Sequence, residues 1–211
     1  MNKYEISKLS TSQNPFGKSI VGVVLCGGLS KRMGTDKGTL KTRGKYWADY
    51  SLTILKNFTN TVIFSIREDQ FGLYRKIFPN SNLILDNANA KGPLNGILSV
   101  YEKFPDCDLL IHACDMISMD KNIVSILYTK FKNFTGFEFY VFKIDGKIEP
   151  LCGIYTCHGL KKLKNQIDSV GFQSYSLKEI LAKFKTLYIE DENISKNFFK
   201  NINYPEDILL E

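Results

Sequence analysis

Four short apolar runs in the first half of the chain narrow the folds that it can adopt. Their apolar residues follow one another without the alternation expected of a strand with one face in water, which is typical of strands buried on both faces. The runs occupy residues 19–26, 61–66, 82–86 and 108–114, and helix-like segments lie between them at about 47–58, 69–78 and 94–104. Strands that alternate with helices in this way predict a mostly parallel sheet covered by helices on both faces.

The second half of the chain has a looser pattern. Asp145 and Gly146 separate two β-rich stretches and favour a tight hairpin turn between them. We expect these strands at 137–144 and 148–156, helices at 161–167 and 176–184, and short strands at 186–190 and 198–203. Neither an internal repeat nor a linker interrupts the sequence. We therefore expect one domain over residues 19–211, preceded by a polar, mobile leader over residues 1–18.

Composition and charge exclude some classes of protein. Hydrophobic residues make up 44% of the chain and charged residues 24%, as in an ordinary soluble globular protein. No apolar stretch reaches about 18 residues and no secretory signal is recognisable, which predicts a cytoplasmic protein without a membrane span. The five cysteines include no CxxC pair, so we expect free thiols. The net charge of +6 suits nucleic acid, a membrane surface or a phosphate-rich small substrate, and scattered lysines do not choose among them.

Each of the four apolar runs ends in small, polar or charged residues. In order along the chain these are Gly27 and Gly28, then Ser65 and Arg67, then Asp86, and finally Asp115. In open parallel sheets, ligands bind outside the carboxyl ends of the strands. The four sets of residues therefore predict a binding site at one edge of the sheet.

The first run leads into a glycine-rich, cationic stretch, LCGGLSKRMGTDKGTL, which covers residues 25–40. Gly27 and Gly28 leave backbone N–H groups uncovered, so a nucleotide can approach closely, and Arg32 and Lys37 add positive charge. Neither a P-loop nor the GxGxxG pattern fits the glycines of this region. A plain turn with solvated cations would explain the same residues, so the stretch alone leaves the function open.

The same stretch resembles the signature of the molybdenum cofactor guanylyltransferases, the MobA family. That signature usually reads LAGGxSxRMGxDK, with alanine where this chain has Cys26. Four further segments resemble family motifs in the same order along the chain: LILDNANAKGPLNGI, HACDMISM, EPLCGIY and NINYPEDI. The resemblance implies a three-layer α/β/α sandwich with a mostly parallel, Rossmann-like central sheet of the nucleotide-diphospho-sugar transferase type.

The resemblance also implies a reaction. Such an enzyme transfers GMP from GTP to the terminal phosphate of molybdopterin, releases pyrophosphate and depends on Mg²⁺. The expected partners are GTP and a molybdopterin that another cofactor-biosynthesis protein could deliver. Neither nucleic acid nor a membrane is expected as a partner.

Site residues follow from the resemblance position by position. Nucleotide contacts are implied for Leu25, Cys26, Gly27, Gly28, Lys37, Ser65, Asp86 and Asp115. Lys37 would contact the phosphates, Asp115 would hold Mg²⁺, and both are expected to be catalytic together with Arg32. Pterin contacts are implied for Arg32, Asn201 and Asn203. Without a ligand, Asp86 could instead open an Asx-turn and Asp115 could cap a helix.

The chain departs from the family pattern at several positions. Ser65 stands where asparagine is common, Ile117 and Ser118 replace a proline and an aromatic residue, and Tyr204 replaces a threonine. The alternatives are a molybdopterin cytidylyltransferase, another small-molecule nucleotidyltransferase, or a non-catalytic protein that binds nucleotide or nucleic acid. The sequence has no basic run with interleaved aromatic residues of the kind that single-stranded nucleic acid favours, which argues against nucleic acid.

Overall fold

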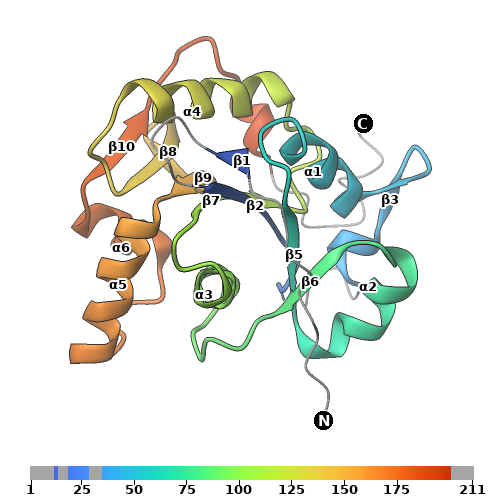
Figure 1. Ribbon diagram of the computed structural model, residues 1–211. Helices are drawn as coiled ribbons and strands as arrows, with labels where there is room; N and C mark the ends of the chain where they lie inside the picture. Colours follow the sequence, from blue (N-terminus) through green and yellow to red (C-terminus); the bar gives the residue numbers. More distant parts are fainter. Residues whose placement is uncertain (1–11, 14–18, 29–34, 201–211) are drawn as a thin grey trace.

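A mixed, mostly parallel sheet forms the middle layer of the molecule (Figure 1). The computed structural model describes residues 12–13, 19–28 and 35–200. Seven strands lie side by side within these ranges, in the order β10-β8-β9-β7-β2-β5-β6, and β1 (Ser12–Gln13), which falls in the predicted leader, pairs with the start of β2. Their bounds are β2 (Ser19–Leu25), β5 (Val62–Ile66), β6 (Asn82–Leu85), β7 (Asp108–Ala113), β8 (Phe139–Ile144), β9 (Lys147–Tyr155) and β10 (Thr186–Ile189).

The directions of the strands match the prediction. β7, β2, β5 and β6 are parallel neighbours, and β10 is parallel to β8. β9 runs antiparallel to both β7 and β8. The turn from β8 into β9 has positive φ at Asp145 (49°) and Gly146 (74°), as a two-residue hairpin turn of the primed type requires. The predicted Asp-Gly hairpin is therefore confirmed.

Helices cover both faces of the sheet, which confirms the three layers (Figure 1). One face carries α1 (Trp47–Leu55), α2 (Phe71–Ile77) and α4 (Lys121–Asn133), and the other carries α3 (Pro93–Lys103), α5 (Cys157–Val170) and α6 (Leu177–Lys183). Strand β2 supplies both cores, because Ile20 and Val24 pack on the first face and Val21 and Val23 on the second. Among the described helices, none has the length and apolar character to cross a membrane.

Local signals explain where several helices begin and end. The Asp120 side chain accepts a hydrogen bond from the Asn122 N–H and caps α4, a helix that the sequence pattern did not predict. The Thr156 hydroxyl accepts from the Gly159 N–H, so α5 begins four residues before its predicted start. The helix runs on to Val170 and stops at Gly171, whose φ is 75°.

The predicted strand over residues 198–203 is wrong where the structure describes it. Residues Lys196–Phe199 form a short 3₁₀ helix, η3. The Ser195 hydroxyl caps it by accepting from the Asn197 N–H, and the Phe199 ring packs 5.1 Å from that of Phe142. A cap followed by an aromatic anchor therefore outweighs the β-propensity of two adjacent phenylalanines. Residues from 201 onward lie outside the described part of the chain.

Candidate active site

The carboxyl ends of four adjacent parallel strands form one edge of the sheet. Leu25 at the end of β2 pairs with Ala113 of β7 on one side and with Ser65 of β5 on the other. The ladder continues beyond the strands, because the Cys26 N–H donates to the Ser65 carbonyl at 2.9 Å and the Asp86 N–H to the Ile66 carbonyl at 2.8 Å. The polar residues that follow these strands therefore gather at one edge, as the sequence predicted.

Lys37 and Asp115 are in direct contact at this edge. The Lys37 ammonium donates to the Asp115 carboxylate at 2.7 Å, and the two side chains are only 16% and 15% exposed. Lys37 begins the short 3₁₀ helix η1 (Lys37–Thr39), which the Asp36 side chain caps by accepting from the Gly38 N–H at 2.9 Å. The structure thus joins the predicted phosphate-binding cation to the predicted metal ligand.

The Asp86 carboxylate is closely surrounded by small residues. The Ser65 hydroxyl, which is wholly buried, donates to Asp86 Oδ1 at 2.6 Å. A Cβ atom at Gly27 would overlap the Asp86 carboxylate, and one at Gly96 of α3 would overlap the Ser65 hydroxyl. Glycine at both positions therefore lets the first loop and α3 approach this carboxylate.

The environment of Asp86 makes its side chain harder to ionise than a free carboxyl group. Burial raises the pKa of this carboxyl above its usual value, while the hydrogen bond from Ser65 and the positive charge of Arg67 oppose the rise. The hydroxyl of Ser65 is directed at Asp86. In this arrangement Ser65 orients the carboxylate that was predicted to bind the nucleoside.

Trp47, the single tryptophan of the chain, packs against the two segments that carry Lys37 and Asp115. Its wholly buried indole packs against Leu40, three residues after Lys37, and Ile117, two residues after Asp115. The indole N–H donates to the Thr42 hydroxyl at 2.9 Å, at the start of the β3 (Lys41–Thr42) and β4 (Lys45–Tyr46) hairpin. Trp47 is therefore a natural fluorescent reporter of the segments that contain Lys37 and Asp115.

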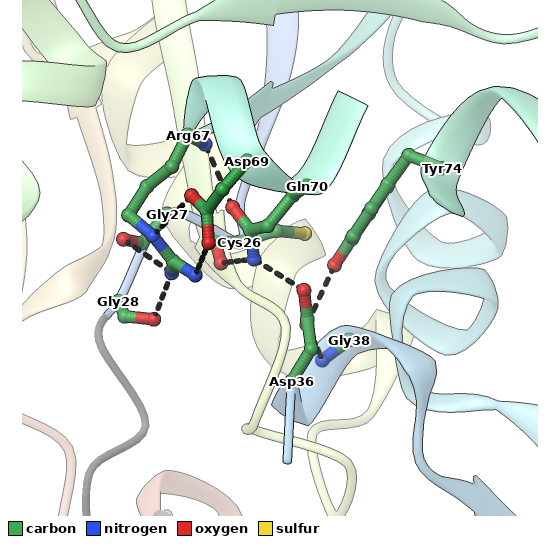
Figure 2. A network of polar contacts seen from close by, with 9 residues as sticks. All are labelled: Cys26, Gly27, Gly28, Asp36, Gly38, Arg67, Asp69, Gln70 and Tyr74. Atoms are coloured by element: carbon green, nitrogen blue, oxygen red, sulfur yellow. Dashed lines mark hydrogen bonds and ion pairs between the residues drawn. The ribbon is translucent and has the colours of Figure 1, made fainter. Parts of the chain in front are cut away.

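A polar network beside the loop that follows β2 contains Arg67, which the sequence placed at a strand end, and Gln70, which it did not assign to the site (Figure 2). The Arg67 guanidinium donates to the carbonyls of Gly27 and Gly28 at 3.1 and 2.6 Å. The Gln70 amide donates to the Cys26 carbonyl at 3.0 Å and to the Asp36 carboxylate. The sequence pointed to Arg67 only as a polar residue at a strand end. Gln70 gave no signal, because its partner at Cys26 is a backbone atom.

A divalent cation fits the donor set at Asp115. Mg²⁺ is usually held by one or two carboxylates together with substrate phosphates and water, so a protein cage of several ligands is not required. In the described ranges no group of three or more His, Cys, Asp or Glu residues is placed to hold a metal. The largely buried Asp115 carboxylate supplies the hard oxygen ligand that such a site needs.

Three of the predicted site residues cannot be placed. Arg32, Asn201 and Asn203 lie outside the described residues. Leu25, Cys26, Gly27, Gly28, Lys37, Ser65, Asp86 and Asp115 all lie within them, at or next to the strand edge.

Comparison with known proteins gives the family. Residues 22–184 match the model of the MobA-like NTP transferase domain. A molybdenum cofactor biosynthesis bifunctional protein of Synechocystis sp. is 30% identical over 95% of this chain, and the chain spans about half (54%) of that relative. A probable molybdenum cofactor guanylyltransferase of Halalkalibacterium halodurans is 27% identical over 89% of this chain and 95% of its own length.

Solved structures share the fold. Molybdopterin-guanine dinucleotide biosynthesis protein A of Archaeoglobus fulgidus superimposes with a TM-score of 0.73 at 22% identity, over 90% of this chain and 95% of its own. A cytidylyltransferase of Leptospira borgpetersenii superimposes with a TM-score of 0.65 at 18% identity, over 89% of this chain and 82% of its own. With the sheet edge and the family match together, the chain belongs to the MobA-like NTP transferase domain family and is a nucleotidyltransferase.

Proposed function

We propose that the protein transfers GMP from GTP to the terminal phosphate of molybdopterin, releasing pyrophosphate. The observation that carries the proposal is the contact of Lys37 with Asp115 at the carboxyl edge of the sheet, next to the glycines that end β2. The relative from H. halodurans is named a probable guanylyltransferase for this cofactor, which supports the choice of substrates.

Lys37 and Asp115 have complementary tasks in this reaction. A triphosphate brings several negative charges to the site, and Lys37 offers a compact cation to its oxygens. Asp115 would hold Mg²⁺ through its carboxylate, which is a suitable ligand. A metal held there would neutralise phosphate charge and polarise the phosphorus that is attacked. The largely buried pair limits solvent around these charges, which strengthens each interaction.

The chemistry of phosphoryl transfer asks little else of the protein. The phosphate of molybdopterin attacks the α-phosphorus in line with the departing pyrophosphate, so the bonds made and broken are both P–O bonds. No side chain has to become a nucleophile, and the rate gain comes from positioning and from neutralising charge. The residues proposed for the pterin side, Arg32, Asn201 and Asn203, complete the site on that basis.

Selection of the nucleotide base is assigned to the loop that follows β2 and to Asp86. Guanine offers N1–H and N2–H₂ donors, which suit backbone carbonyl or carboxylate acceptors, whereas adenine lacks both donors. The Ser65 hydroxyl donates to Oδ1 of Asp86, and Oδ2 lies against Gly27, so the carboxylate is held at the loop that follows β2. A site that hydrogen-bonds a group can reject an analogue lacking it by up to about 10⁴-fold.

The alternative is cytidylyl transfer to the same acceptor. The cytidylyltransferase of L. borgpetersenii shares the fold, and a fold shared at 18% identity does not select between guanine and cytosine. Thermal shift with GTP, CTP, ATP and UTP, each with and without Mg²⁺, tests the choice of nucleotide. A Mg²⁺-dependent shift with GTP alone supports the proposal. No shift with any nucleotide contradicts it and favours a protein of another class.

The cellular setting is part of the same proposal. We infer a cytoplasmic enzyme made of one domain, which receives molybdopterin from another cofactor-biosynthesis protein and uses neither nucleic acid nor a membrane as partner. A pull-down with tagged protein, followed by assay of the eluate for bound molybdopterin, tests the delivery step.

A further inference from the structure

The Arg67 side chain has almost all of its donors committed. Its Nε and one terminal nitrogen donate to the two oxygens of Asp69, each at 2.9 Å. The other terminal nitrogen donates to the Gly27 and Gly28 carbonyls at 3.1 and 2.6 Å (Figure 2). A guanidinium has five N–H donors in a rigid plane, so these four bonds fix its orientation. Arg67 is thus held in one orientation against the backbone of the loop that follows β2, called here the nucleotide loop, at Gly27 and Gly28.

These bonds also fix the peptide planes of the loop. The C=O and N–H of a trans peptide point to opposite sides, so the peptide between Gly27 and Gly28 directs its N–H away from Arg67. A Cβ atom at Gly28 would meet no atom of the described residues within 4 Å, so that part of the molecule leaves open space beside Gly28. Arg67 therefore sets the direction in which the loop presents its backbone.

Gln70, three residues after Arg67, forms hydrogen bonds to Arg67, Cys26 and Asp36. Its side-chain oxygen accepts from the Arg67 N–H at 2.7 Å, and its amide nitrogen donates to the Cys26 carbonyl at 3.0 Å and to the Asp36 carboxylate. The residue is only 4% exposed, so these bonds form in a place where few waters can replace them.

Asp36 carries the connection on to Lys37. Its carboxylate accepts from the Tyr74 hydroxyl at 3.0 Å and from the Gly38 N–H at 2.9 Å, and thereby caps the helical turn that Lys37 begins. An unbroken series of hydrogen bonds therefore runs from Gly28 through Arg67, Gln70 and Asp36 to the turn of Lys37 (Figure 2).

We propose that Arg67 and Gln70 are positioning residues that set the nucleotide loop and Lys37 in one fixed arrangement for binding the triphosphate. The planar guanidinium of Arg67 binds the carbonyls of Gly27 and Gly28, and a positive charge without this geometry is not sufficient. Gln70 acts through Cys26 and Asp36. The inference rests on the proposed nucleotidyl transfer and assigns to it two residues outside the glycine-rich stretch.

The experiment compares three variants with the wild type. Arg67→Lys keeps the positive charge and loses the planar guanidinium. Gln70→Glu keeps the acceptor for the Arg67 N–H but loses both donated bonds and faces the Asp36 carboxylate with a second negative charge. Arg75→Lys is the matched control, because Arg75 also donates to two backbone carbonyls, those of Pro79 and Ser81, away from the loop.

The measurements are the Kd of Mg·GTP from Trp47 fluorescence or calorimetry, the KM values for GTP and molybdopterin, and the melting temperature. We expect the Kd and the KM for GTP to rise about tenfold or more for Arg67→Lys and Gln70→Glu, by loss of at least one charge-assisted bond. The KM for molybdopterin should stay close to that of Arg75→Lys for both variants, and so should the melting temperature of Arg67→Lys. Gln70→Glu should melt at a lower temperature, because it buries a second negative charge beside Asp36. A purely structural role would instead lower the melting temperature without changing the KM for GTP.

The outcomes separate this inference from the function on which it rests. If the wild type binds Mg·GTP and the two variants bind it within twofold of wild type, the positioning role is wrong and the proposed function stands. If the wild type binds CTP in place of GTP and the variants weaken CTP to the same degree, the positioning role stands and the choice of base is wrong. If the wild type binds no nucleoside triphosphate, both are wrong.

Discussion

The Lys37 ammonium donates a hydrogen bond to the Asp115 carboxylate at 2.7 Å across 78 residues of sequence. Lys37 is expected to contact phosphate and Asp115 a metal ion. Without these ligands, the two side chains neutralise each other's charge. If both ligands bind as proposed, one ion pair is exchanged for two, in a place where both side chains are largely buried and charge pairing matters.

Asp115→Asn should abolish transfer while it leaves the fold intact. The amide is nearly isosteric and still accepts from Lys37, but it lacks the negative charge that Mg²⁺ needs. We expect turnover to fall by at least about 100-fold, with a stability cost of about 1 kcal/mol. Pyrophosphate release and thermal unfolding measure the two effects. Wild-type turnover at saturating GTP and ordinary Mg²⁺ would show that Asp115 is not the ligand.

Lys37→Ala should cost about 2–4 kcal/mol of transition-state stabilisation, as for removal of one preorganised donor. Lys37→Arg should also be poor, because a broad planar group does not replace a point charge in the small space beside Asp115. The ratio kcat/KM for GTP gives both values. A rate for Lys37→Ala within about threefold of wild type would place the role of this residue outside catalysis.

Gly27→Ala should weaken nucleotide binding, because its Cβ would overlap the Asp86 carboxylate and force it away from the Ser65 hydroxyl. Overpacking of this kind costs about 1–3 kcal/mol of folding stability. Displacement of the carboxylate should also weaken GTP binding, by about tenfold if one hydrogen bond of about 1.4 kcal/mol is lost. Gly72→Ala in α2 is the control, since a Cβ there meets no atom within 4 Å. Equal GTP affinity in the two variants would remove Asp86 from the nucleotide site.

His112 should make the fold less stable in mild acid. This histidine is wholly buried in β7, with Nδ1 2.9 Å from the Ser51 hydroxyl and no hydrogen-bond partner for Nε2 among the described residues. Burial lowers its pKa from 6.5 to about 4. The unfolded chain then binds the extra proton between these values. The free energy of unfolding therefore falls as the pH decreases from 6.5 towards 4, by up to about 3 kcal/mol.

Urea unfolding of wild type and His112→Gln across this range isolates the effect. As the pH falls, the unfolding free energy of the wild type should decrease more than that of His112→Gln. A difference in unfolding free energy between the two proteins that is constant with pH would mean that the imidazole is equally protonated in the folded and unfolded chains.

The sequence sufficed for the features that depend on burial and on strand direction. Asp86 and Asp115 could be assigned to one edge because each follows an apolar run, and parallel strands end at the same side. The tight turn at Asp145-Gly146 could be predicted because few dipeptides adopt its positive φ angles. These signals are local, so one sequence is enough to recognise them.

Other features depend on tertiary contacts to backbone atoms. Arg67 bonds to the Gly27 and Gly28 carbonyls, and any residue provides a carbonyl, so no sequence pattern marks its partners. The orientation of the Ser65 hydroxyl towards Asp86 depends on the register of β5 against β6 and on the close approach of Gly96. Such contacts become visible only once the layers are packed.

The most direct test of the account is the identity of the product. Wild-type protein with Mg²⁺, molybdopterin and equal concentrations of GTP and CTP should form the guanine dinucleotide of molybdopterin, with one pyrophosphate released for each molecule formed. The preference for GTP should reach about 10²-fold or more. The cytosine dinucleotide as the main product, or GTP hydrolysis without any dinucleotide, would contradict guanylyl transfer.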